Sequence, residues 1–141
     1  MKTEVVQKAV VVNDHGDILM LRRSKTDVRR PLQWDLPGGI READEELMAS
    51  VLREIHEETK LVIHNAKPFF TKTEVRTWEN DQGKQTENVV FIFYLAHTNN
   101  SEIKLSYEHD KAAWKPATQA LKEFQYPLHQ EVLRHLINNR L

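Results

Sequence analysis

The N-terminal part of the chain alternates between apolar runs and short polar breaks, which is typical of strands joined by turns. Residues 3–12 are rich in β-branched side chains, residues 13–17 are polar and include a glycine, and an apolar run resumes at residues 18–21. This pattern predicts a β-hairpin. A further short strand is predicted at residues 34–36, because the Pro-Gly-Gly sequence that follows would end it.

A helical period replaces the strand pattern between residues 43 and 59. Apolar residues recur at every fourth position and form one stripe, at Leu47, Val51 and Ile55. Asp44 precedes the stripe and is the expected N-cap, which places Glu45 in the first turn, where the helix dipole favours a carboxylate. We therefore expect an amphipathic helix with its apolar stripe packed on a sheet.

The remaining chain predicts more strands and two helices. Strands are expected at residues 62–63, 69–75 and 89–96 and just before Trp114, and helices at residues 117–123 and 128–138. The run at 89–96 is almost continuously apolar, as in a buried strand. A polar loop is predicted at residues 78–84. This order indicates one mixed α/β (α+β) domain over residues 1–141, without repeats or linkers.

Composition restricts the class of protein. The chain has 141 residues, of which 40% are hydrophobic and 29% are charged, and its net charge is -1. These values fit a globular domain and give no overall field that would attract nucleic acid. The absence of cysteine excludes disulfides, thiolate metal sites and a cysteine nucleophile. No secretory signal or apolar run of roughly 20 residues is present, so we expect a cytoplasmic protein without a membrane partner.

Three glutamates crowd one face of the predicted helix near its C-terminal end. Glu54, Glu57 and Glu58 stand at i, i+3 and i+4, so their charges repel one another and oppose the helix dipole. A divalent cation would turn this repulsion into coordination, and carboxylates suit Mg²⁺, which is commonly shared with substrate phosphates. Gly38 and Gly39 precede the helix and would let backbone approach the same place.

The segment from Gly39 to Leu61 resembles the Nudix box, G-x5-E-x7-R-E-U-x-E-E-x-G-U, in which U is aliphatic. The matched positions are Gly39, Glu45, Arg53, Glu54, Ile55, Glu57, Glu58 and Leu61. Lys60 stands where the family has a glycine, which would serve as a left-handed C-cap at a cost of about 1 kcal/mol for another residue. The chain is expected to retain activity, because every acidic position is intact. The resemblance implies the Nudix α/β/α sandwich, with a mixed sheet between helices.

The resemblance also implies a metal site. Glu57 and Glu58 would be the principal ligands of Mg²⁺, for which Mn²⁺ could substitute, aided by the carbonyl of Gly38. Glu54 would serve as the catalytic base or as a further ligand, and these roles are both open. Gly39 would lie beside the substrate.

Two further residues of the box would support this site. Arg53 would orient a catalytic glutamate through charge-assisted hydrogen bonds. Glu45, two turns earlier, would support Arg53 or a metal-bound water. The reaction implied is attack of water on phosphorus, which converts a nucleoside diphosphate derivative, NDP-X, to NMP and P-X.

Outside the box, further residues are candidates for the site. Arg22 and Arg23 end the strand before the box and would contact phosphate or base, or else form a solvated basic edge. Glu108 and Trp114 resemble the EHxxxxW stretch of some Nudix hydrolases, in which a loop acid completes the metal shell. Glu87 competes with Glu108 for that role. The seven histidines show no metal-ligand spacing.

Several substrates and classes of protein stay open. Nucleoside triphosphates and dinucleoside polyphosphates lead, the latter because of the EHxxxxW resemblance. ADP-ribose and nucleotide sugars are alternatives, as is a catalytically silent nucleotide-binding module. A nucleotide-type small molecule is the expected partner. Nucleic acid is not expected, although capped RNA and a homodimer both stay open.

Overall fold

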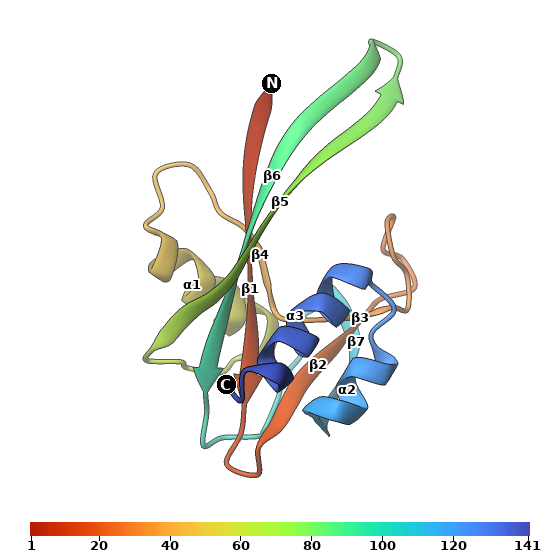
Figure 1. Cartoon of the computed structure of the whole chain (residues 1–141). Helices are drawn as coiled ribbons and strands as arrows, with labels where there is room; N and C mark the ends of the chain where they lie inside the picture. The colour runs from red at the N-terminus through yellow and green to blue at the C-terminus, as the bar shows by residue number, and fades with distance from the viewer.

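The computed structural model describes residues 1–141. The molecule is a strongly twisted mixed β-sheet with helices on both faces (Figure 1). The seven strands are β1 (Lys2–Val12), β2 (Asp17–Arg23), β3 (Trp34–Asp35), β4 (Gly38–Ile40), β5 (Ala66–Asn80), β6 (Gly83–His97) and β7 (His109–Pro116). The three helices are α1 (Leu47–Thr59), α2 (Ala117–Glu123) and α3 (Pro127–Asn138). None of the helices is long and apolar enough to cross a lipid bilayer. The predicted sandwich of helices around a mixed sheet is confirmed.

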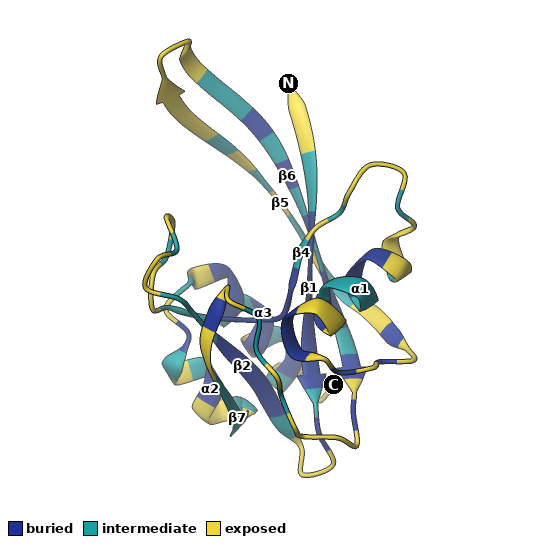
Figure 2. Ribbon diagram, turned by 180° about the vertical axis from the view of Figure 1, so that it is seen from behind, coloured by how far each residue is buried: buried dark blue, intermediate teal, exposed yellow.

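The two faces of the sheet carry two separate hydrophobic cores. In β1, Val6 and Val10 belong to the core beneath α2 and α3, whereas Ala9 and Val11 belong to the core beneath α1. Successive residues of a strand point to opposite faces, so one run of valines supplies both cores. Figure 2 shows the buried central strands between α1 on one side and α2 and α3 on the other.

The strand order brings distant segments to the site. The path runs β3-β2-β1-β6-β5, with β4 paired to β1 and β7 paired to β2. The predicted β1–β2 hairpin is confirmed, and β1 also pairs with β6 in parallel. In β4, Gly38 lies opposite Lys8 of β1, and in β7, His109 lies opposite Arg23 of β2. The segments before α1 and before β7 therefore meet at the same part of the sheet.

Helix α1 begins later than predicted. Its N-cap is Glu46, whose carboxylate accepts a hydrogen bond from the amide of Ala49 at 2.8 Å. Asp44 is not the cap, because its φ of 67° places it in a left-handed turn, and Glu45 therefore lies before the first turn. At the other end Lys60 adopts the left-handed conformation at φ 64° and donates its amide to the carbonyl of His56. The helix thus ends in the geometry that a glycine would normally provide.

Two other predictions were wrong. Residues 62–63 form no strand: the segment between α1 and β5 is irregular, with Leu61 and Ile63 buried in the core beneath α1 and Val62 exposed. Residues 78–84 are not a loop, since β5 continues to Asn80 and β6 begins at Gly83. The two strands form a long hairpin whose outer part reaches beyond the rest of the sheet (Figure 1). Neither face of its outer part is packed against a helix, so the alternation of apolar and polar residues that marks a strand is missing there.

Candidate active site

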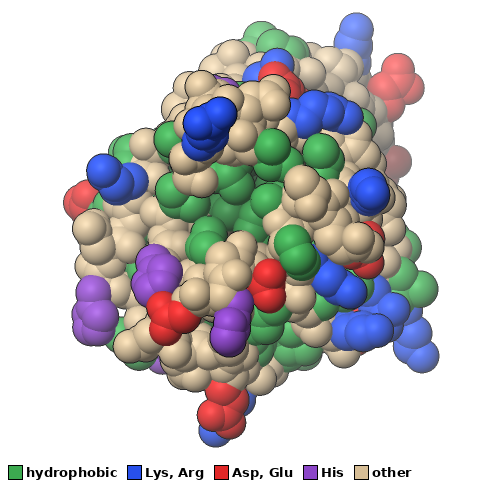
Figure 3. Space-filling view, turned by 60° about the horizontal axis from the view of Figure 1, so that its bottom comes forward, with side chains coloured by type: hydrophobic (Ala, Val, Ile, Leu, Met, Phe, Trp, Pro, Cys, Tyr) green, Lys and Arg blue, Asp and Glu red, His purple; other side chains and the backbone are tan.

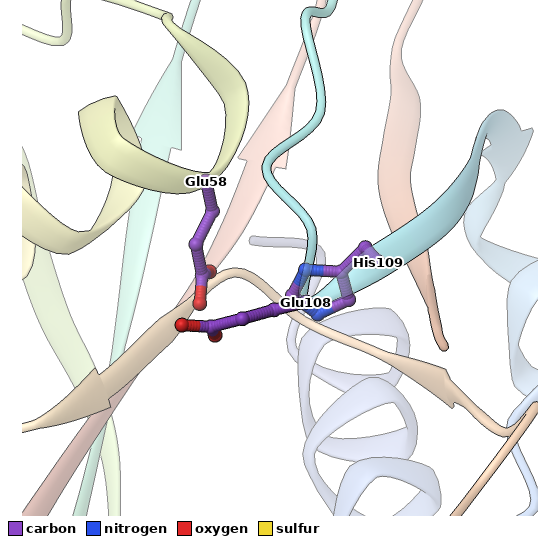
Figure 4. Close-up of side chains that lie close together, drawn as sticks. All are labelled: Glu58, Glu108 and His109. Atoms are coloured by element: carbon purple, nitrogen blue, oxygen red, sulfur yellow. The ribbon is translucent and has the colours of Figure 1, made fainter. Parts of the chain in front are cut away.

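Three potential metal ligands from separate segments meet at the end of α1. Glu58 lies in the last turn of α1, Glu108 ends the loop before β7, and His109 is the first residue of β7. Each offers one ligand atom, and these three atoms all lie within 4.8 Å of one another. Figure 4 shows the three side chains close together. Glu108 therefore lies next to the last turn of α1, while its role as a metal ligand stays a prediction.

The loop before β7 is anchored at both ends. The amide of Lys104 donates to the carbonyl of Thr59, the last residue of α1, at 3.0 Å. Near β2, the amide of Ser24 donates to the carbonyl of Glu108 at 3.0 Å, and its hydroxyl donates to the carbonyl of Tyr107 at 2.7 Å. These bonds fix the backbone that carries Glu108 toward Glu58.

Glu58 is a buried carboxylate with few compensating partners. Only 4% of the residue is exposed, and its Oε1 accepts one hydrogen bond, from the amide of Gly38 at 2.9 Å. Burial raises the pKa of Glu58 to about 8, although the charge of Lys8 and the Gly38 amide act in the opposite direction. The carboxylate is therefore costly to ionise without a further cation nearby.

His109 is the residue that sequence reasoning missed. Its side chain is buried, and its Nδ1 has no hydrogen-bond partner. Burial lowers the pKa of His109 to about 4, so the imidazole is neutral at neutral pH, which is the form that binds metal. The signal in the sequence was its position directly after Glu108. The spacing between histidines could not reveal His109, because the other two members of the cluster are glutamates, Glu108 of the loop and Glu58 of α1.

The donor set fits a divalent cation. Two carboxylates and one neutral imidazole with an unused nitrogen converge from three elements. Carboxylate oxygens suit Mg²⁺ or Mn²⁺, whereas an imidazole nitrogen is more typical of Zn²⁺ and other transition metals. A cation there would also neutralise the buried carboxylate of Glu58. The residues present therefore fit a divalent cation.

Arg53 holds the remaining acids of the helix surface together. Its guanidinium donates to both carboxylate oxygens of Glu45, at 2.7 and 2.9 Å, and to those of Glu57, at 3.0 and 3.1 Å. It also lies 3.3 Å from a carboxylate oxygen of Glu54. The hydrogen bonds from Arg53 lower the pKa of Glu45 to about 2. Arg53 thus compensates part of the repulsion among the glutamates of α1. Its predicted role, to orient a catalytic glutamate, stays a prediction.

Glu54 and Glu57 are more exposed than Glu58, and both lie close to Arg53. The side chain of Glu57 is 55% exposed and is bound to Arg53. Glu54 is half-buried, and burial raises its pKa, with Arg53 opposing the shift. The roles of Glu57 as a principal ligand and Glu54 as a base therefore stay predictions.

The two glycines before α1 make close contacts with different consequences. A Cβ on Gly39 would lie 2.8 Å from the carboxyl carbon of Glu54, so a side chain there would displace that carboxylate. Gly38 has a φ of 139°, and a Cβ there would lie 2.0 Å from the carbonyl oxygen of Gln7. The structure shows the Gly38 amide bound to Glu58, whereas a ligand role for its carbonyl stays a prediction.

A second ionic cluster surrounds the buried carboxylate of Asp35. Cationic or basic side chains of four residues lie within 4 Å of it, at Lys8, Arg23, Arg30 and His129. Burial alone would raise the pKa of Asp35, but these neighbours hold it well below its usual value. The carboxylate also accepts a hydrogen bond from the amide of Leu36 at 2.8 Å.

The other predicted residues have partners elsewhere. Arg22 donates to Asp110 at 2.8 Å, and Arg23 belongs to the Asp35 cluster, so substrate contact by either arginine stays a prediction. Glu87 is buried in β6 opposite Arg76 and does not belong to the Glu58 cluster. The structure thus places Glu108 rather than Glu87 beside Glu58 and His109.

A pocket of about 710 Å³ lies away from this cluster, at the end of the sheet where β1 and β6 finish. Hydrophobic side chains line a hollow at that end, with histidines beside it, in Figure 3. No acidic side chain lines the pocket. The candidate active site is therefore identified by its chemistry and not by the size of a cavity.

Comparison with known proteins decides the family. A sequence model of the NUDIX domain matches residues 2–136. The chain belongs to the Nudix family. As a member of this family, the chain is a Nudix pyrophosphohydrolase. No curated protein matches the sequence.

Solved structures agree with this assignment. The MutT protein of Methanosarcina mazei is 26% identical, with a TM-score of 0.74 over 99% of this chain and 95% of that one. Two others share the Nudix fold at lower identity. The NUDIX domain of Shewanella oneidensis NrtR, complexed with ADP-ribose, is 19% identical with a TM-score of 0.75 over 100% of this chain and 90% of that one. A C. elegans Ap4A hydrolase is 20% identical with a TM-score of 0.66 over 93% of each chain.

Proposed function

We propose that this Nudix hydrolase uses Mg²⁺, or Mn²⁺ in its place, to cleave a pyrophosphate linkage in a nucleoside diphosphate derivative and to release NMP and P-X. The observation that carries the proposal is the meeting of Glu58, Glu108 and His109 beside the Gly38 amide. When bound, a divalent cation neutralises phosphate charge and lowers the pKa of a coordinated water.

The residues of the chain divide the work. Glu58, Glu108 and His109 would hold the cation, and Glu57, which now contacts Arg53, would be a further ligand. Glu54 accepts the proton of the attacking water, since burial raises its pKa and makes it a better base than an exposed glutamate. Arg53 positions Glu54, and Glu45 holds Arg53 through its paired hydrogen bonds.

The substrate class that we propose is a nucleoside carrying three or more phosphates, either a nucleoside triphosphate or a dinucleoside polyphosphate. Support for the second comes from the Glu108-His109 sequence six residues before Trp114 and from the fold shared with the Ap4A hydrolase. ADP-ribose is the second candidate, because the NrtR domain that binds it resembles the whole of this chain in fold.

A substrate panel tests the proposal. The purified protein is incubated with Mg²⁺ and, separately, with nucleoside triphosphates, diadenosine tetraphosphate and ADP-ribose, and the products are separated by ion-exchange chromatography. We expect NMP with pyrophosphate, or NMP with the complementary nucleotide, and no product with a chelator. Glu58→Gln serves as the matched inactive variant. Failure to cleave any pyrophosphate linkage, with nucleotide binding retained, would overturn the proposal.

A further inference from the structure

Strand β5 is a long unprotected edge of the sheet. It pairs with β6 on one side only, and the sheet ends there. Figures 1 and 2 show the outer part of the β5–β6 hairpin extending away from the helices. An edge strand presents a row of unpaired amide and carbonyl groups, which is a template for pairing with another chain. An isolated two-stranded hairpin is also only marginally stable in water.

The side chains of this edge are not arranged to block pairing. Val75 is 62% exposed and Trp78 is 44% exposed, and the strand has no proline after Pro68. Glu74 and Arg76 flank Val75, and neither is part of an ion pair in the structure; the guanidinium of Arg76 lies over the ring of Phe91 at 5.4 Å. Glu74 and Arg76 therefore form no ion pair within the chain, although Glu87 of β6 lies opposite Arg76 in the strand register.

We propose that β5 binds the β5 edge of a second copy of this chain, antiparallel and with Val75 on the two-fold axis. A two-fold axis normal to the sheet places residues of the same face opposite one another, so one residue must lie on the axis. With Val75 there, Glu74 lies opposite the partner's Arg76, and Arg76 lies opposite the partner's Glu74. The pairing forms two cross-strand ion pairs and a central valine pair.

Neighbouring registers are less favourable. With Glu74 or Arg76 on the axis, two like charges lie directly opposite each other, which is destabilising. An axis at Thr77 would place no opposite charge against Glu74 or Arg76. An axis at Thr73 would place Lys72 opposite the partner's Glu74, but Lys72 already lies 3.3 Å from Glu131 of α3. That register would also bring Pro68 into the ladder, where proline has no amide to donate and where the β5–β6 register is interrupted. The charges together with Pro68 thus favour the register with Val75 on the axis.

Disulfide trapping tests the register, because the chain contains no cysteine of its own. Val75→Cys is oxidised at micromolar concentration and analysed on a non-reducing gel, with Val62→Cys, also exposed, as the control. We expect most of Val75→Cys to become a covalent dimer. Thr73→Cys and Thr77→Cys should each crosslink weakly alone, because equal positions are about 13 Å apart along the strands.

The mixture of Thr73→Cys and Thr77→Cys provides the decisive comparison, since these two positions lie opposite each other in the proposed pairing. We expect the mixed disulfide to form several-fold faster than either homodimer. Equal rates in the mixture and in the separate variants, or no excess of Val75→Cys over Val62→Cys, would overturn the proposal.

Charge exchange tests the same interface without crosslinking. In light scattering after size exclusion we expect a dimer for the unmodified protein and a shift to monomer for Glu74→Arg and for Arg76→Glu. The double variant Glu74→Arg/Arg76→Glu should restore the dimer, because it restores both ion pairs. A monomeric unmodified protein, or a double variant that behaves like the single ones, would contradict the proposal. The result does not depend on the substrate or on the proposed hydrolysis.

Discussion

Asp35 and Glu58 are both buried carboxylates, but their surroundings have opposite effects on them. Asp35 is surrounded by Lys8, Arg23 and His129, and its pKa is held well below the usual value. Glu58 accepts one amide hydrogen bond and has a pKa raised to about 8. Its nearest other potential ligands are a second carboxylate and a neutral imidazole.

The difference separates a carboxylate that the chain itself compensates from one that we propose as a metal ligand. The cations that compensate Asp35 are supplied by the chain itself, so this cluster stabilises the fold around β2, β3 and α3. No side chain supplies an equivalent cation to Glu58 and Glu108. Two neighbouring carboxylates without a nearby cation lower the stability of the fold, and a cation bound from solution would remove this destabilisation. Four predictions test this contrast, from the largest effect to the smallest.

Glu58→Gln should cause the largest loss. The amide keeps the size of the side chain but removes a charged ligand, so kcat/KM should fall about a thousandfold or more, which corresponds to roughly 4 kcal/mol. Steady-state assays with Mg²⁺ measure the effect, with the exposed Glu102→Gln as the control. Activity within tenfold of the unmodified protein would show that Glu58 is not a ligand.

Asp35→Asn should instead reduce stability. It leaves several buried cations without their carboxylate, and we expect the free energy of unfolding to fall by about 3 kcal/mol. Urea denaturation followed by circular dichroism measures the change. In the presence of a chelator, Glu58→Gln should be neutral or stabilising in the same experiment. If both variants lost stability equally, the contrast between the two carboxylates would be wrong.

The pH dependence of stability should show the raised pKa of Glu58. Between pH 6.5 and 8, with a chelator present, unfolded Glu58 is ionised while folded Glu58 keeps its proton, so the unfolded state binds fewer protons and stability falls as pH rises. The slope is at most about 1.4 kcal/mol per pH unit. His109 and His129 act in the opposite direction near pH 6.5, because burial lowers their pKa values to about 4 and about 3 while their unfolded forms are still half protonated. Above about pH 7.5 both histidines are largely neutral in both states, so the slope due to Glu58 is read there.

Urea denaturation at several pH values measures this slope, and Glu58→Gln is the matched control. The slope should be smaller in the variant. A slope that is the same in both proteins would assign the effect to another group and would leave Glu58 with an ordinary pKa.

Lys60→Gly should have the smallest effect. Glycine adopts the left-handed conformation of this C-cap without strain, so the free energy of unfolding should rise by about 1 kcal/mol or less. Because neither buried carboxylate is touched, kcat should stay within about twofold. Thermal denaturation and the substrate assay measure the two quantities. A large loss of activity would show that Lys60 acts in the site.

The strands and helices with one buried face could be predicted from the sequence, because their apolar residues recur with the period of a strand or a helix. The β1–β2 hairpin and the apolar stripe of α1 are examples. The start of α1 could not, since a cap at Glu46 rather than Asp44 depends on backbone torsions set by the preceding turn. The outer β5–β6 hairpin was missed because neither of its faces is buried against a helix.

The candidate site was predictable only where the motif is local. Glu58 and the two glycines lie within a short stretch, and Glu108 was found through its resemblance to a family stretch. His109 was not, because its role depends on β7 pairing with β2 and bringing it to the end of α1. The pairing of Arg53 with Glu57 agrees with the i,i+4 spacing of a helix. The contact of Arg53 with Glu45, which precedes the helix, and that of Arg23 with Asp35 depend instead on how the chain folds between them.

Crystals soaked with Mn²⁺ and measured for anomalous scattering test the central claim most directly. The account predicts one strong anomalous peak bonded to Glu58, Glu108 and His109 at about 2.0–2.3 Å. The peak should be absent in Glu58→Gln crystals soaked in the same way. A peak elsewhere on α1 with none between these three side chains, or no peak at all with a nucleotide present, would contradict it.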